Sequence, residues 1–296
     1  MRHYARMTSR SVLLLLLPAA LSAQAADSAQ RARECPPCAE WNAHQAPFRI
    51  YGNTYYVGPR GMSAVLVTSE AGHVLLDAAL PESAERIAAN IRALGFRVED
   101  VKLILNSHAH YDHAGGIAAL QRASGAQVAA TARSAAMLEL GAPTRDDPQF
   151  GAALSYPRVS NVRVIEPGDT LRVGSLVLIA HLTAGHTPGS TTWTWRSCEG
   201  ERCLDMVYAD SQTPVSADDF YYTRSTAYPT GVQDFERGQA LLERLPCDVL
   251  ITPHPGASRL FERAAAGELV DSSACRKYAE NARRQLAARV AREKGD

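Results

Sequence analysis

Four side chains that can bind metal ions lie within six consecutive residues. They are His108, His110, Asp112 and His113, in the motif His-x-His-x-Asp-His. Only nine of the 296 residues are histidines, and three of them fall in this stretch. Imidazole suits zinc, and a carboxylate can join it. Four such residues this close cannot all reach one ion comfortably, so the motif predicts two neighbouring ions rather than a polar loop with chance histidines.

Two further histidines lie in turns that follow predicted strands. His186 stands in Gly-His-Thr-Pro-Gly, and His254 in Thr-Pro-His-Pro-Gly. Glycine and proline fix the shape of each turn and hold the imidazole rigidly. Three protein ligands per zinc leave a position for water, which is typical of a catalytic site. We therefore predict two sets: His108, His110 and His186 (the first ligand set), and Asp112, His113 and His254 (the second ligand set).

The elements that must position these ligands can be read from the hydrophobic pattern. The apolar run at 101–105 predicts a buried strand, and a helix begins after the motif, so the ligands follow the carboxyl end of a strand, where open α/β sheets carry sites. Strands followed by helices, twice over, predict two packed β-sheets with helices outside, a four-layer αβ/βα sandwich. The other predicted strands are 48–53, 55–58, 63–67, 73–77, 127–130, 162–165, 171–173, 176–181, 191–196, 206–209 and 248–252.

The first 25 residues have the pattern of a secretory signal peptide. Arg2, Arg6 and Arg10 precede an apolar run at 12–17, and an Ala-x-Ala cleavage site ends at Ala25. The apolar run is too short to span a membrane. We therefore expect an exported protein in which residues 26–296 form a single domain, beginning with an irregular arm over 26–47.

The six cysteines support export, because an even number in an exported chain implies disulfides. The pair Cys198 and Cys203 flanks a polar turn and is expected to bridge a hairpin. Cys247 and Cys275 would tie the final helix to the sheet. Cys35 and Cys38 form a Cys-x-x-Cys motif that could be redox-active, bind zinc or close a structural loop. We favour the structural disulfide. The three pairs are Cys35 and Cys38, Cys198 and Cys203, and Cys247 and Cys275.

Charge and composition exclude some function classes. The chain is 46% hydrophobic and 21% charged, which is ample for a globular core. Lys and Arg balance Asp and Glu at 31 each, and removing the signal peptide leaves 28 basic against 31 acidic residues. A nucleic-acid partner would need a basic patch, so we expect none.

The ligand motifs together resemble the metallo-β-lactamase fold superfamily, and the likeness covers nearly the whole mature chain. The His-x-His-x-Asp-His motif alone also occurs in glyoxalase II, lactonases and RNA-processing nucleases of that superfamily. Within it the chain resembles class B β-lactamases of the third subclass. In that subclass a serine replaces a zinc-binding cysteine, as at Ser211 in the segment 208–213. The segments 52–58, 193–203 and 247–255, and Trp41 in the arm, are also similar.

The resemblance implies a function and roles for individual residues. Two Zn²⁺ ions would bind the two ligand sets, and Asp112 would also orient the attacking hydroxide. Asp77 would orient a ligand, or else cap a loop. The implied protein is a periplasmic monomer, without a membrane partner after cleavage, that hydrolyses penicillins, cephalosporins and carbapenems and confers antibiotic resistance. The implied substrate contacts are Ser211 and Thr213 at the substrate carboxylate, Gln149 and Phe150 in a loop over the site, and Trp41 in its wall.

Two rival functions stay open. In a glyoxalase II-like thioesterase or a lactonase, an aspartate near Asp210 bridges both metals, although export and disulfides argue against those enzymes. A secreted zinc-binding protein without catalysis would need four ligands per ion, and the sequence offers three.

Two other histidines are expected outside the site: His73 at the surface, where it opens a strand, and His181, packed inside one.

Overall fold

The computed structural model describes residue 1 and residues 35–295. The predicted signal peptide, apart from Met1, and the first part of the arm lie outside the described residues. The chain divides into two compact units, Met1–Ala39 and Glu40–Asp296. Within the first unit the Cys35–Cys38 disulfide closes a four-residue loop, which confirms that these two cysteines pair. The short helix α2 (Cys38–Trp41) interrupts the arm that we predicted to be irregular.

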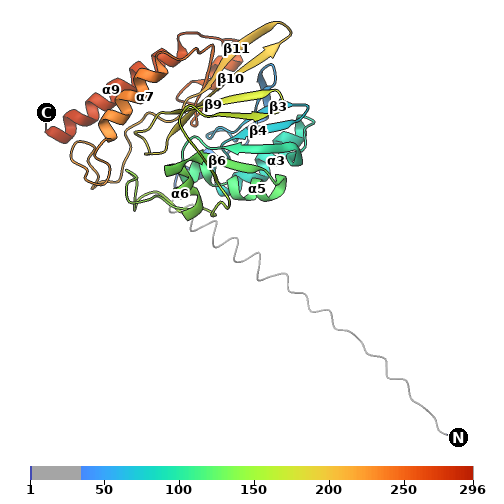
Figure 1. The fold of residues 1–296 in the computed structure, drawn as a ribbon, viewed down its shortest axis with the longest axis horizontal. Coiled ribbons are helices and arrows are strands. Elements are labelled where there is room, and N and C mark those ends of the chain that lie inside the picture. Colours follow the sequence, from blue (N-terminus) through green and yellow to red (C-terminus); the bar gives the residue numbers. More distant parts are fainter. Residues whose placement is uncertain (2–34, 296) are drawn as a thin grey trace. The chain divides into compact units, whose positions relative to one another are not determined.

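The second unit holds two mixed β-sheets (Figure 1). In the first sheet the strands lie side by side in chain order, antiparallel from β1 to β4 and parallel from β4 to β7. Parallel neighbours need crossover connections, which helices supply after β4, β5 and β6. The strands are β1 (Phe48–Tyr51), β2 (Thr54–Tyr56), β3 (Val65–Ser69), β4 (Gly72–Leu76), β5 (Val101–Leu105), β6 (Gln127–Thr131) and β7 (Arg163–Ile165).

The second sheet has the order β12-β11-β10-β9-β8. Its strands are antiparallel except for the pair β11 and β12. Cys198 and Cys203 face each other near the end of the β10–β11 hairpin and form the expected disulfide. The strands are β8 (Thr170–Val173), β9 (Leu176–Leu182), β10 (Thr191–Glu199), β11 (Arg202–Tyr208) and β12 (Val249–Ile251).

Alternation along the strands separates the hydrophobic layers. In β3, Val65 and Val67 face the second sheet and pack in one cluster with Leu178 and Trp193, whereas Leu66 packs in the cluster that includes the helices. Successive side chains of a strand point to opposite faces, so each strand of the first sheet serves both layers. Trp193 also donates its indole N–H to the carbonyl of Asn106 over 3.0 Å, which ties the second sheet to the segment just before the ligand motif.

Helices cover the outer faces of both sheets and complete the predicted four-layer sandwich, which is confirmed. In Figure 1, α3, α5 and α6 lie on the side of the first sheet, and α7 and α9 run together beside the second. The Cys247–Cys275 disulfide joins α9 to the residues that lead into β12, as predicted. The helices are η1 (Pro81–Ser83), α3 (Ala84–Ala93), η2 (Val98–Asp100), α4 (Tyr111–Ala114), α5 (Ile117–Ser124), α6 (Ala132–Leu140), α7 (Gly231–Leu242), α8 (Leu260–Ala266) and α9 (Ala274–Lys294).

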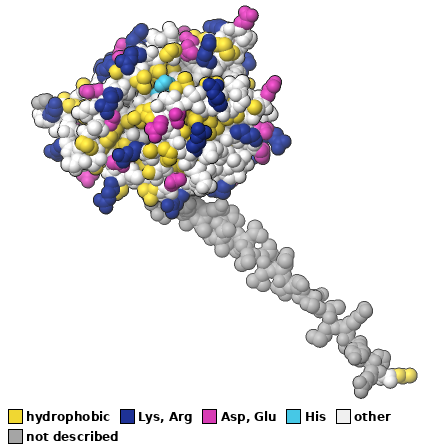
Figure 2. Space-filling model, viewed as in Figure 1, with side chains coloured by type: hydrophobic (Ala, Val, Ile, Leu, Met, Phe, Trp, Pro, Cys, Tyr) yellow, Lys and Arg dark blue, Asp and Glu magenta, His cyan; other side chains and the backbone are white. Residues whose placement is uncertain are grey.

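The surface in Figure 2 carries basic and acidic side chains interspersed with each other and with apolar ones. No extended patch of one sign is visible on that face. Among the residues that the structure describes, no helix combines the length and apolar character needed to cross a membrane.

Candidate metal centre

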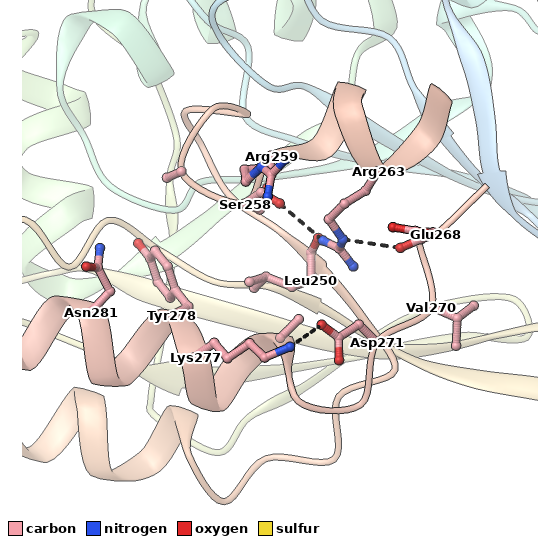
Figure 3. Close-up of a pocket in the computed structure, with 12 residues that line it drawn as sticks. Leu250, Ser258, Arg259, Arg263, Glu268, Val270, Asp271, Lys277, Tyr278 and Asn281 are labelled. Atoms are coloured by element: carbon pink, nitrogen blue, oxygen red, sulfur yellow. Dashed lines mark hydrogen bonds and ion pairs between the residues drawn. The ribbon is translucent and has the colours of Figure 1, made fainter. Parts of the chain in front are cut away.

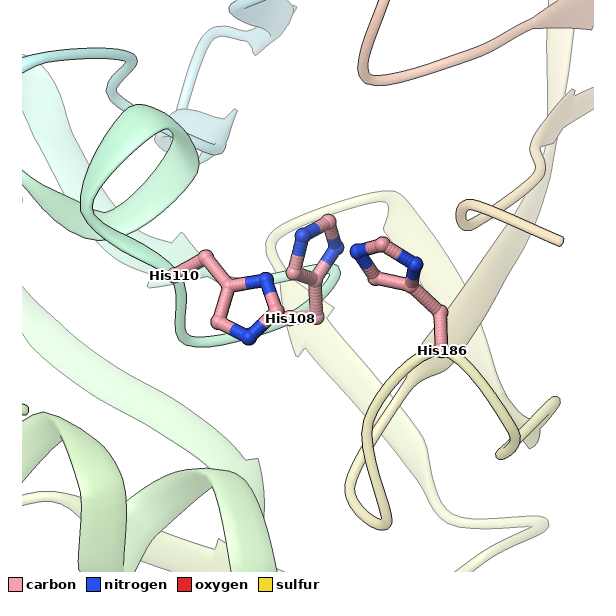
Figure 4. Close-up of side chains that lie close together, drawn as sticks. All are labelled: His108, His110 and His186. Carbon is pink, nitrogen blue, oxygen red and sulfur yellow. The ribbon is translucent and has the colours of Figure 1, made fainter. Parts of the chain in front are cut away.

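The first ligand set converges from two loops. His108 and His110 follow β5, and His186 lies in the loop between β9 and β10. Figure 4 shows the three imidazole rings turned toward one another. Their nearest ring nitrogens all lie within 4.8 Å of one another, and the three residues are buried. This spacing allows the three nitrogens to hold one metal ion.

In two of these imidazoles, a hydrogen-bond acceptor orients the ring through the nitrogen that faces away from the centre. His108 Nδ1 lies 2.7 Å from Asp210 Oδ1, and His186 Nδ1 lies 2.8 Å from the carbonyl oxygen of Thr213. Each acceptor fixes the N–H on Nδ1, so the lone pair is on Nε2, which faces the centre. An acceptor behind the ring is the usual way in which proteins set the tautomer and orientation of a metal-binding histidine.

The third imidazole, that of His110, is held through Nε2 instead of Nδ1. His110 Nε2 lies 3.1 Å from both carboxylate oxygens of Asp147, so Nδ1 is the free nitrogen. The amide nitrogen of Gln149 lies 3.4 Å from His110 Nδ1 and 3.5 Å from His186 Nε2. Gln149 therefore covers the nitrogens that face the centre, as expected for a residue in a loop over the site.

The second ligand set surrounds one carboxylate oxygen. Asp112 Oδ2 lies 3.2 Å from His113 Nε2 and 3.5 Å from His254 Nε2. Asp112 and His113 are buried, whereas His254 is half-buried. His108, Asp112 and His113 also have ligand atoms within 4.8 Å of one another, so the two sets are adjacent. The structure thus brings together all six predicted ligands.

The electrostatic environment favours the protonation state that a metal needs at three of the ligands, whereas at His110 and His113 a neighbouring aspartate outweighs burial and raises the pKa. Burial, together with the neighbouring histidines, lowers the pKa of His186 to about 3 and holds the pKa of His108 well below its usual range. Burial alone would raise the pKa of Asp112, but the charges and hydrogen bonds of His113 and His254 outweigh it and hold that pKa well below its usual range. Two neutral imidazoles and an ionised carboxylate are suited to binding a cation.

Buried ring nitrogens without hydrogen-bond partners also fit a bound metal. His108 Nε2 and His113 Nδ1 are buried without a hydrogen-bond partner among the described residues. Buried polar atoms normally have partners, because an unsatisfied one costs about 1–3 kcal/mol. A donor set of imidazole nitrogens and a carboxylate, left open in this way, is consistent with zinc.

The backbone around the motif is fixed by Asp77, which directly follows β4. Its buried carboxylate accepts hydrogen bonds from the backbone N–H of Ser107 (2.7 Å), the hydroxyl of Ser107 (2.6 Å), Asn106 and Tyr208. Asp77 Oδ2 also lies 4.0 Å from His113 Nδ1. Burial raises the pKa of Asp77 to about 6. The residue therefore shapes the loop before His108 and faces a ligand, which combines the two roles that we weighed.

Close packing explains the glycines near the ligands. A Cβ at Gly116 would lie 2.3 Å from the carbonyl oxygen of Ala78, and one at Gly185 would lie 2.4 Å from the ring of Phe235. Gly185 also has φ +139°, which side chains disfavour.

One detail of our prediction was wrong: Asp112 lies on the one-turn helix α4 and not in a loop, since the N–H of Ala114 bonds to the carbonyl of His110 (2.8 Å).

The predicted substrate contacts lie beside the ligands. Ser211 is buried and directly follows Asp210 in the sequence. Thr213, two residues after Ser211, contacts His186 Nδ1 through its backbone carbonyl. Phe150 is exposed, 47% of its surface being accessible, with the guanidinium of Arg145 5.9 Å from its ring. The ring of Trp41 lies edge-on to that of His254, 5.6 Å between centroids.

Asp147 was missed by the sequence analysis, and Asp210 was considered only as a metal bridge. Asp147 lies in the polar loop after α6, a position without a motif of its own. The expectation for His73 was wrong: it is buried on an interior strand, with its ring 5.1 Å from that of Phe96. His181 is half-buried in β9 and bonds to Thr194, as expected for a packed residue.

Comparisons with known proteins give one consistent result. A family model described as the metallo-beta-lactamase superfamily matches residues 57–263. The solved Rm3 metallo-beta-lactamase is 54% identical, with a TM-score of 0.86 over 88% of this chain and 99% of that chain. MEM-A1, a subclass B3 metallo-beta-lactamase isolated from a soil metagenome library, is 46% identical, with a TM-score of 0.85 over 86% of this chain and 99% of that one. The resemblance to the third subclass is thereby confirmed.

Curated relatives match over shorter stretches. The hydroxyacylglutathione hydrolase of Anaeromyxobacter dehalogenans (strain 2CP-C) is 33% identical over 148 residues, which are 50% of this chain and 44% of that protein. In four of these relatives, this chain covers between 30% and 61% of their length.

Proposed function

The chain belongs to the metallo-β-lactamase superfamily, and we propose that it is a zinc-dependent β-lactamase of the third subclass. It hydrolyses the β-lactam ring of penicillins, cephalosporins and carbapenems, and so confers antibiotic resistance. The observation that carries the proposal is the pair of adjacent ligand sets with Ser211 beside them. Solved neighbours that share this fold at 46–54% identity are named metallo-beta-lactamases.

We assign one Zn²⁺ ion to each ligand set. Imidazole and carboxylate ligands suit zinc, and three protein ligands per ion fit a catalytic rather than a structural site. Bound zinc would act as a Lewis acid on the ring carbonyl and lower the pKa of a water molecule to near neutrality. The buried ring nitrogens that lack partners support this assignment.

The chain's own residues bind and orient the reactants. Asp112, held ionised by His113 and His254, accepts a hydrogen bond from the attacking water and so orients it. Ser211 and Thr213 bind the substrate carboxylate through their hydroxyl groups. No acylated serine is required, since the attacking oxygen comes from water.

The remaining substrate contacts form the walls of the site. Gln149 lies over His110 and His186, and Phe150 is the exposed residue next to it, suited to contact substrate side chains. Trp41 packs edge-on against His254 on the side of the second ligand set.

We propose that the protein works as a monomer in the periplasm after cleavage following Ala25. The signal-peptide pattern and three disulfides, which form and persist in oxidising compartments, support this location. β-Lactams cross the periplasm to reach their targets. The substrates are small molecules, and neither a nucleic acid nor, after cleavage, a membrane is a partner.

The strongest alternative is a glyoxalase II-like thioesterase or a lactonase. The similarity to a hydroxyacylglutathione hydrolase favours it, and Asp210 Oδ2 is buried without a hydrogen-bond partner among the described residues. Against it, Asp210 Oδ1 bonds to His108 on the side of the ring away from the centre, which favours an orienting role over a bridging one.

The test compares substrates directly. Zinc-loaded enzyme is assayed with a penicillin, a cephalosporin, a glutathione thioester and a homoserine lactone. We expect turnover of the two β-lactams, abolished by chelator and unaffected by clavulanate, which needs a serine to acylate. Brisk cleavage of the thioester or the lactone without β-lactam turnover would establish the alternative.

A further inference from the structure

A tyrosine on the last helix contacts the backbone on both sides of Ser211. The hydroxyl of Tyr278 donates to the carbonyl oxygen of Asp210 over 3.0 Å and accepts from the backbone N–H of Gln212 over 3.2 Å. Tyr278 lies on α9, 67 residues beyond Ser211 in the sequence. One phenol group therefore spans the residue that we assign to the substrate carboxylate.

Few other hydrogen bonds hold the backbone from Asp210 to Gln212. The side-chain amide of Gln212 donates to the carbonyl of Ser211 over 3.2 Å and to that of Thr183 over 2.9 Å, and the backbone N–H of Asp210 donates to the hydroxyl of Thr192. The Ser211 hydroxyl has no hydrogen bond among the described residues, which leaves it available to a substrate. Without the phenol group, the carbonyl of Asp210 and the N–H of Gln212 would lose a partner, and unsatisfied buried groups force a backbone to shift.

The base of this contact is rigid. Cys275, three residues before Tyr278 on α9, is bonded to Cys247, so the same turn of the helix is joined to the residues that lead into the strand β12. Behind the ring lies a cavity of about 590 Å³, whose wall Tyr278 shares with Leu250 and Lys277 (Figure 3). Because one side of the ring borders open space, the two hydrogen bonds help to set where the phenol group points.

We propose that Tyr278 is a positioning residue that holds Ser211 in the orientation needed to bind the substrate carboxylate. It touches neither substrate nor metal. The inference rests on the proposed function, since it assigns a role in substrate binding. It predicts that removing the hydroxyl impairs binding of the substrate more than the chemical step.

The kinetic test uses Tyr278→Phe in the full zinc-loaded enzyme. We expect KM for a penicillin to rise about two- to tenfold, as loss of an ordinary hydrogen bond would produce, with kcat nearly unchanged and zinc content equal to that of the wild type. In a Ser211→Ala background the same substitution should add little to KM, because the two changes act on one interaction. The matched control is Tyr51→Phe, whose hydroxyl also donates to a backbone carbonyl, that of Arg202, far along the chain.

Hydrogen exchange gives a readout that does not depend on activity. Mass spectrometry should detect faster amide exchange in the peptide that spans 209–215 of Tyr278→Phe, but not of Tyr51→Phe. Unchanged exchange and unchanged KM would overturn the inference, as would a full additional rise of KM in the Ser211→Ala background. Loss of zinc would instead place the effect at His108, through Asp210. A wild-type enzyme without β-lactam turnover would refute the proposed function, while the exchange data would still decide whether Tyr278 holds this segment.

Discussion

At the metal centre, the ligands are aimed by groups that do not themselves face the ion. Asp210 and Asp147 accept from the outer nitrogens of His108 and His110, and a backbone carbonyl does the same for His186. The ligands can be recognised from the sequence, but the contacts that these two aspartates make cannot. The ligand motif is local in sequence, whereas Asp147 and Asp210 reach histidines 37 and 102 residues away. Only the folded chain brings such partners together, so the ligand types were predictable and the groups behind them were not.

Replacing Asp147 tests this arrangement. Asp147→Asn keeps the size of the side chain but removes the charge that holds the N–H of His110, so we expect zinc affinity at the first ligand set to fall about 10- to 100-fold. Competition with a chromophoric chelator measures the affinity. The control is Asp146→Asn, whose carboxylate pairs with Arg133 (2.6 Å) away from the ligands. Equal zinc affinity in both variants would show that Asp147 does not orient His110.

Among the elements, the strands with an apolar run were predicted, and the one-turn helix α4 was not. β3 and β5 are apolar on both faces because each face packs against a hydrophobic layer, and such a run is visible in sequence. The helix α4 has a single turn, too short for any periodicity, and its shape depends on contacts with Ala78 and Ala79. Short helices of this kind are set by tertiary packing rather than by local preference.

The start of α9 yields a prediction about stability and pH. The Asp271 carboxylate accepts hydrogen bonds from the backbone N–H and hydroxyl of Ser273 and pairs with Lys277 at 3.1 Å. The bonds from Ser273 lower the pKa of Asp271 from 3.8 to about 2. We expect Asp271→Ala to reduce the free energy of unfolding by about 1 kcal/mol at pH 7, as for loss of a helix cap.

The pH dependence of that difference follows from the sign of the shift. A depressed pKa in the folded state gives stability that is present above pH 3.8 and is lost as the pH falls through about 2. The destabilisation by Asp271→Ala should therefore shrink toward pH 2. Urea unfolding at several pH values measures it, with Glu280→Ala on the exposed face of α9 as the control. A difference that stayed constant down to pH 2 would contradict the assigned role.

For the molecule as a whole, the metal centre lies where both sheets contribute loops. The first sheet supplies the ligand motif, and the second supplies the turns of His186 and His254. A metal ion bound there links the two halves of the sandwich. The buried ring nitrogens, which lack partners without an ion, make the metal-free state the less stable one.

We therefore expect zinc to raise the melting temperature. Binding to the folded state at 100 times the dissociation constant stabilises by about 2.7 kcal/mol, which for a protein of this size corresponds to a shift of roughly 5–10 °C. Scanning calorimetry of chelator-treated protein, with and without added zinc, measures the shift. Identical melting curves would mean that the ions do not bind between the two halves.

We propose that these six residues hold the ions that make the protein a β-lactamase. The most direct measurement is a zinc titration of chelator-treated enzyme that follows both bound zinc and the loss of carbapenem ring absorbance. We expect negligible turnover without zinc and activity that increases until about two ions are bound per chain. Full turnover in the metal-free enzyme, or none at any zinc content, would contradict it.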